Sequence, residues 1–120
     1  MEAAIKACRG TLTSSGTSEV IAVVSDGDPT ARVGTNARCA SNSGNTPCKA
    51  AAATEADAAK ADGIILATAF VFDTAGEGSD FLKNQISSDP VNLAVTDTAT
   101  PDAVELATNI VNIVSPCSSD

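Results

Sequence analysis

Two carboxylates follow directly after a run of apolar residues, in the segment VIAVVSDGDPT at 20–30. Asp26 and Asp28 therefore stand where a buried strand is expected to emerge into a loop. Carboxylates placed there could bind Mg²⁺ or Ca²⁺, which take oxygen ligands, but one carboxylate with water binds such an ion weakly. From the residues alone, Asp26 with Asp28 beside it is therefore at most an incomplete metal site. Two other interpretations stay open: a plain Asp-Gly turn, and a site that another segment or chain completes.

The four cysteines are the other reactive side chains: Cys8, Cys39, Cys48 and Cys117. Cys39 and Cys48 enclose a polar loop, and a disulfide there would close a ring of about ten residues, worth roughly 2 to 3 kcal/mol. We predict this disulfide and, with it, an oxidising compartment, extracellular or at the cell surface. A zinc site is not expected, because Cys39 and Cys48 do not have the spacing of zinc ligands and the chain contains no histidine. The pairing of Cys8 and Cys117 stays open, although Cys8 is expected to pack in the core as a small apolar residue.

The sequence argues against catalysis. It contains no His, no Tyr and no Gly-x-Ser-x-Gly, so a Ser or Cys nucleophile would lack its usual base. The GEGSDF segment at 76–81 begins like a dinucleotide-binding fingerprint, but Phe81 stands where the third small residue should be, so a turn is expected. Loop acids such as Asp97 and Asp102 are expected to be solvated. We predict that the protein is not an enzyme.

Charge and composition exclude two classes of partner. Fifteen acidic and seven basic residues give a formal net charge of −8, which repels phosphate backbones and anionic membrane surfaces. Three Phe and no Trp or Tyr leave few platforms on which bases could stack. No apolar run approaches the roughly 20 residues that span a bilayer, and the first residues are typical of an amphipathic helix rather than a secretory signal. Neither nucleic-acid binding nor membrane insertion is expected.

The hydrophobic pattern predicts alternating helices and strands. Three segments are expected to form strands: 19–25, 64–72 and 91–95. The run within 19–25 is continuous and rich in β-branched residues, which is typical of a strand buried on both faces. Four segments have helical patterns or capping signals: 2–14, 47–62, 79–87 and 100–114. The polar connection at 26–46 far exceeds the usual 4 to 6 residues or so, which indicates a functional or stapled loop. Strands joined by helices predict one α/β domain over 1–120, with a parallel sheet and helices on both faces.

Several sequence segments, taken in their order along the chain, resemble the second half of a von Willebrand factor type A (vWA) domain. The pair EAAIKACRGTL and VIAVVSDGDPT resembles the family's helix and the strand ending in Thr-Asp-Gly, with Ser25 in place of the Thr. Three later phrases resemble the elements that follow: AAKADGIILATAFVF, FLKNQISSDP and VNLAVTDTATPDAVELATNIVNIV. The resemblance covers nearly all of residues 2–117. It implies an open, Rossmann-like parallel sheet that lacks the family's first strands, and hence a partial domain.

The resemblance also implies a site and a function. The family's metal-ion-dependent adhesion site needs an Asp-x-Ser-x-Ser motif, which this chain does not contain, so only Asp26 maps onto it. Without its family neighbour, the strand at 19–25 would expose a flat apolar edge that pairs with another chain. The family implies a non-enzymatic extracellular module for cell adhesion, binding a protein partner through loops at 26–48, 73–79 and 95–101. The alternative is a structural subunit of an extracellular filament or matrix, an oligomer of copies of itself assembled by strand complementation.

Overall fold

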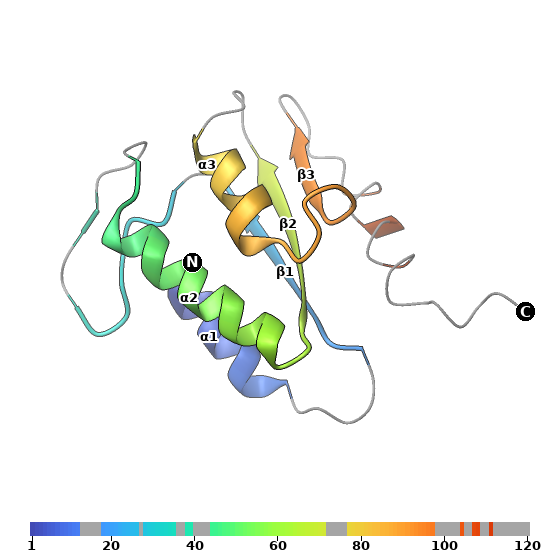
Figure 1. The fold of residues 1–120 in the computed structure, drawn as a ribbon, viewed down its shortest axis with the longest axis horizontal. Helices are drawn as coiled ribbons and strands as arrows, with labels where there is room; N and C mark the ends of the chain where they lie inside the picture. The colour runs from blue at the N-terminus through green and yellow to red at the C-terminus, as the bar shows by residue number, and fades with distance from the viewer. Residues whose placement is uncertain are drawn as a thin grey trace, which may run out of the picture.

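The computed structural model describes residues 1–12, 18–26, 28–35, 38–39, 44–71, 77–97, 104, 107–108 and 111. Helices and strands alternate along the chain, as predicted (Figure 1). The elements are α1 (Glu2–Thr11), β1 (Val20–Ser25), α2 (Pro47–Ala61), β2 (Ile65–Val71), α3 (Glu77–Phe81), the π-helical turn η1 (Leu82–Ile86) and β3 (Ala94–Asp97). In the described part of the chain, no helix is long and apolar enough to cross a bilayer.

The three strands form one parallel sheet in the order β1-β2-β3. Val20 pairs with Ile65 at the start of β1, and Thr68 of β2 pairs with Ala94 at the start of β3. The predicted α/β class and the parallel direction of the strands are thus confirmed. Because all three strands point the same way, their carboxyl ends lie at one edge of the sheet, the carboxyl edge (Figure 1).

Helix α2 begins and ends at the predicted signals. The side-chain oxygen of Thr46 accepts a hydrogen bond from the backbone N–H of Lys49 at 3.2 Å, and Pro47 occupies the first turn, where no N–H is needed. After the last turn, Gly63 adopts a φ of 84°, a left-handed conformation that favours glycine, and its N–H donates to the carbonyl of Lys60. The chain can therefore turn directly into β2.

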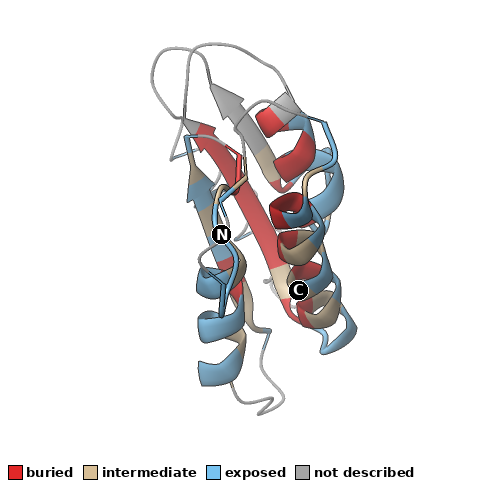
Figure 2. Cartoon of the chain, turned by 90° about the vertical axis from the view of Figure 1, so that its left-hand side faces the viewer, coloured by how far each residue is buried: buried red, intermediate tan, exposed pale blue. Residues whose placement is uncertain are grey.

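The main core lies between the described helices and one face of the sheet. Its members come from α1, α2, α3, η1, the first two strands and the residue just before β2: Ile5, Ile21, Ala52, Ala56, Ala59, Ile64, Leu66, Phe70, Phe81, Leu82 and Ile86. The small side chains of Ala52, Ala56 and Ala59 let α2 pack closely in this core. Figure 2 shows the buried residues gathered along β2 and the helix surfaces that face it.

The other face of the sheet carries a smaller core of Ala67, Ala69 and Leu93. The predicted helix at 100–114, which would cover this face, lies largely outside the described residues. Only four of its residues are described, and each has helical backbone: Val104, Ala107, Thr108 and Val111.

Strand β1 differs from the prediction of a strand buried on both faces. Ile21 is its only buried residue, and Val24 is 63% exposed. Ala22 and Val24 share the face of the strand opposite to Ile21, which packs in the main core with the helices, and β1 also lies at the edge of the described sheet. Helix α1 ends at Thr11, before the predicted end at residue 14, and the prediction that Cys8 packs in the core is wrong, because this thiol is exposed.

The third strand and the GEGSDF segment also need correction. The strand predicted at 91–95 is found at Ala94–Asp97, and Val91 is 80% exposed. A turn takes the predicted place, because the carboxylate of Asp89 accepts hydrogen bonds from the backbone N–H groups of Val91 and Asn92. The chain is already helical at Glu77 and Gly78, where a turn is expected, and the helix predicted at 79–87 is found as α3 followed by η1.

Candidate functional site at the carboxyl edge

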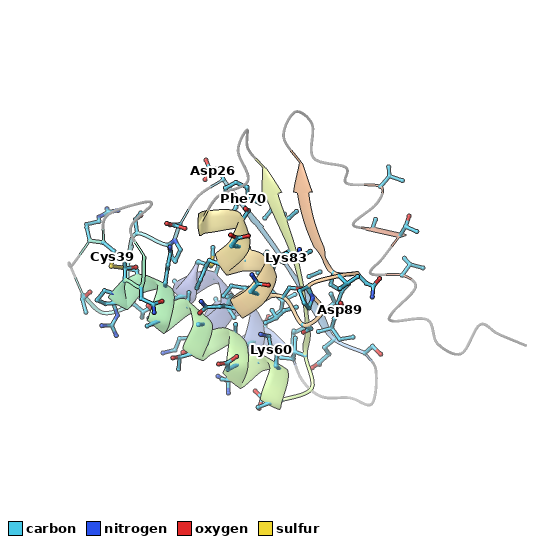
Figure 3. All side chains as sticks on the ribbon, turned by 45° about the horizontal axis from the view of Figure 1, so that its top comes forward. Asp26, Cys39, Lys60, Phe70, Lys83 and Asp89 are labelled. Atoms are coloured by element: carbon cyan, nitrogen blue, oxygen red, sulfur yellow. A yellow bond between two sulfur atoms is a disulfide. The ribbon has the colours of Figure 1, made fainter. Side chains whose placement is uncertain are left out.

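Asp26 and Asp28, the two acids that follow β1, have different environments. Asp26 follows β1 directly and is exposed at the carboxyl edge, where Figure 3 labels it. The side chain of Asp28 is only 1% exposed. The sequence predicts one pair of acids, whereas the structure separates a solvent-facing carboxylate from a buried one.

Asp28 forms a buried ion pair with Lys49, in the first turn of α2. The distance from Asp28 Oδ2 to Lys49 Nζ is 3.1 Å, and the Lys49 side chain is only 5% exposed. Lys49 Nζ also lies 5.9 Å from the centroid of the Phe81 ring at the end of α3, within the range of a cation–π contact. One lysine thus connects the loop after β1 with two helices.

Gly78 lets α3 approach this ion pair. A Cβ atom at this position would lie 3.0 Å from Asp28 Oδ1 and 3.1 Å from Cε2 of Phe70. Both neighbours are themselves buried, so neither can move away easily. Gly78 therefore has a packing role. The sequence shows only that a glycine stands between a predicted strand and a predicted helix.

The predicted disulfide between Cys39 and Cys48 is confirmed. It joins the end of the loop to the first turn of α2, and the backbone N–H of Cys48 also donates to Cys39 Sγ (Figure 3). Within the loop, the N–H of Cys39 donates to the carbonyl of Thr30, next to a β-bridge between Ala31 and Arg38. The loop is therefore fastened at its end and folded back on itself.

A further contact attaches the loop to α1. The carboxylate of Glu2 accepts a hydrogen bond of 2.9 Å from the backbone N–H of Val33. Together with the ion pair and the disulfide, it fixes the described part of the segment 28–39 at three points. We call this segment the stapled loop. Its residues Ala31, Arg32, Val33, Gly34 and Thr35 are all exposed.

A shallow pocket of about 300 Å³ lies beside the buried ion pair. Its lining includes Asn45 before α2, Asp80 and Phe81 of α3, and Asn84 and Gln85 of η1. Side-chain amides both donate and accept hydrogen bonds, so this lining could pair with the backbone of a bound peptide or loop.

The described residues fit a divalent cation poorly. No group of three His, Cys, Asp or Glu side chains among them could hold a metal ion. The carboxylate of Asp28 is engaged by Lys49, which leaves Asp26 as the exposed acid of the predicted site. A site for Mg²⁺ or Ca²⁺ that another segment or chain completes around Asp26 stays a prediction.

The sequence analysis missed a polar network at the opposite end of the sheet. Ser88 bonds to both backbone groups of Leu66: its N–H donates to the carbonyl, and its Oγ accepts from the N–H at 2.8 Å. Ser87 Oγ donates to the carbonyl of Leu93 at 3.2 Å, just before β3. The side-chain amide of Asn92 and the N–H groups of Val91 and Asn92 lower the pKa of Asp89. The sequence Ser-Ser-Asp-Pro at 87–90 is typical of a turn and could have predicted this one.

Comparison with known proteins identifies no relative. No family model, curated protein or solved structure matches the chain. The function is therefore argued from the geometry of the chain itself.

Proposed function

We propose that the chain is a non-enzymatic extracellular protein-interaction module, acting in adhesion and built as a partial vWA-like domain. The observation that carries the proposal is the stapled loop, which is held next to the carboxyl edge by a disulfide and a buried ion pair. Ligands of open α/β sheets bind at this edge. The strand order β1-β2-β3 agrees with the order of the last three strands in the vWA sheet, which supports the open Rossmann-like architecture.

The disulfide supports an extracellular or cell-surface location. Disulfides persist in oxidising compartments and are rare where glutathione keeps thiols reduced. The bond lies in the loop that we assign to recognition, so the loop would keep its shape only under oxidising conditions.

A loop fixed in advance is suited to binding a folded protein. Ordering a loop upon binding reduces affinity, and cross-links that hold it in one conformation remove much of this cost. The exposed backbone of the stapled loop and the amide-lined pocket near it would supply the hydrogen bonds, and the exposed Asp26 would supply charge.

Site-specific photo-cross-linking tests this proposal. A photoreactive amino acid replaces Thr35, exposed in the stapled loop, or Thr54, exposed on α2, as a matched control. The oxidised protein is then irradiated in the extracellular medium of the cells that produce it. We expect a protein adduct from position 35 and none from position 54. Equal yields from both positions, or no adduct from position 35, would contradict the proposal.

The second candidate is a structural subunit that assembles through strand complementation. The position of β1 at the edge of the described sheet favours it, because an unpaired strand edge is a template for another strand. Sedimentation of the oxidised protein without added metal would reveal such an assembly as a stable oligomer. A monomer at all concentrations would rule the assembly out.

A further inference from the structure

Within the described part of the chain, the outer edge of β1 presents a regular row of backbone groups that pair with no other strand. The carbonyl of Glu19 accepts a hydrogen bond from Ile65 N at 2.8 Å, so it points toward β2. Successive residues of a strand direct their backbone groups to opposite sides. The N–H and C=O groups of Val20, Ala22 and Val24 therefore point away from β2, to the side where the described chain places no strand.

A groove runs along this edge. It has a volume of about 240 Å³ and lies between β1 and α1. Its lining from α1 includes Ala4 and Cys8, both exposed, beside the buried Ile5. The apolar stripe of α1 is thus only partly covered, and its uncovered side chains face the space next to the strand. An extended segment in this groove would meet backbone hydrogen-bonding groups on one side and apolar side chains on the other.

Acidic residues flank the exposed strand. Glu19 precedes β1, and Asp26 follows it at the carboxyl edge and is exposed. The whole chain has a formal net charge of −8. A segment that pairs with β1 over its full length would therefore gain from a basic residue at each end.

We propose that the edge of β1 binds an extended segment of another protein by strand addition, and that this segment carries basic residues at both ends. The proposal rests on the protein-interaction function above and adds a second surface to it. The backbone groups of β1 select an extended conformation, the groove beside α1 accepts apolar side chains, and the flanking acids select the charge.

The same acids disfavour a second copy of β1 as the partner. In an antiparallel pair with full overlap, Glu19 of one copy lies opposite Asp26 of the other. In a parallel pair, each acid lies beside its own counterpart. Like charges directly opposite each other destabilise a strand pair. We therefore assign the edge of β1 to a basic segment of another protein and not to β1 of a second copy of the chain.

The probe is an eight-residue peptide of alternating Val and Thr with Lys at both ends, which matches the spacing from Glu19 to Asp26. We expect it to bind the oxidised protein and to protect the amide protons of Val20, Ala22 and Val24 from hydrogen exchange. A peptide with Glu in place of both Lys should bind about tenfold more weakly, because two favourable charge pairs become repulsive. Failure of the Lys peptide to protect these amides would overturn the proposal.

Two protein variants test the edge and the groove separately. Ala22→Pro removes an outward-facing N–H without breaking the ladder to β2, as edge strands tolerate, and it should abolish peptide binding. Ala4→Arg fills the groove from α1 and should also abolish binding, whereas Ala50→Arg, at an exposed position of α2, should bind as the unmodified protein does. Full binding by Ala4→Arg would place the peptide elsewhere and overturn the proposal.

The outcomes separate this inference from the proposed function. A cross-linked partner at Thr35 without peptide protection of β1 would leave the interaction module in place and overturn the strand-addition site. Concentration-dependent self-association that Ala4→Arg abolishes would identify a second copy as the occupant and would likewise overturn it.

Discussion

Asp26 and Asp28 show how two acids only two residues apart can take opposite roles. Asp26 faces solvent, while Asp28 is buried against Lys49 and beneath Gly78. The sequence predicts acids at the end of a strand, and the structure places them there. It could not predict that Asp28 turns inward, because its partner lies 21 positions along the chain, on another element. Long-range pairs of this kind depend on tertiary packing, which local patterns do not encode.

Replacing the buried acid should destabilise the fold strongly. Asp28→Asn leaves the Lys49 ammonium buried without its counter-charge, and breaking a buried pair on one side costs about 3 kcal/mol or more. Urea denaturation should show this decrease in the free energy of unfolding. The double variant Asp28→Asn with Lys49→Met should recover part of it, because no unpaired charge remains. A decrease below about 1 kcal/mol in the single variant would mean that this pair does not hold the loop.

Asp89 should make stability depend on pH in the acid range. Hydrogen bonds from Asn92 and the N–H of Val91 lower its pKa below the usual 3.8. The stabilisation is therefore present above that value and is lost as the pH falls through the folded-state pKa. Asp89→Asn should lower the thermal midpoint at neutral pH, and the difference should shrink below the ordinary pKa of 3.8. Asp80→Asn, at an exposed position of α3, controls for loss of charge; a difference independent of pH would contradict this role.

Among the elements, those with local signals were predicted best. Helix α2 has a capping Thr, a first-turn Pro and a terminal Gly, and it begins and ends where these residues predict. Strand β1 was also placed correctly, but its burial was not. A continuous apolar run is typical of a central strand, whereas the number of neighbouring strands is a property of the sheet. Cys8 was wrongly placed in the core because Ile5 is the one buried residue of its helix, and the pattern of apolar residues does not show how much of the apolar side of a helix is covered.

The disulfide should stabilise the stapled loop by a predictable amount. Closing a ring of about ten residues restricts the unfolded chain by roughly 2 to 3 kcal/mol. The double variant Cys39→Ser with Cys48→Ser should lose about this much free energy of unfolding in denaturant titrations. Cys8→Ser is the matched control, because its thiol is exposed and belongs to no disulfide of the structure, and it should leave stability unchanged. Equal losses in the two proteins would contradict the assignment.

At the scale of the whole molecule, two surfaces have different chemistry. The carboxyl edge carries the stapled loop and the exposed Asp26, whereas the outer edge of β1 offers backbone groups and an apolar groove. The net charge of −8 favours basic partners for the molecule as a whole, and Glu19 and Asp26 place acids at both ends of β1. A disulfide that holds one surface in place, together with a strand that has no neighbour on one side in the described sheet, is suited to binding other proteins.

The mass of the photo-cross-linked adduct at Thr35 tests this account most directly. Mass spectrometry under non-reducing conditions should find the 11.9 kDa chain joined to a different extracellular protein, with no such adduct at Thr54. An adduct of two identical chains would contradict the interaction module and support assembly instead. No adduct at Thr35 would contradict the assignment of this loop to recognition.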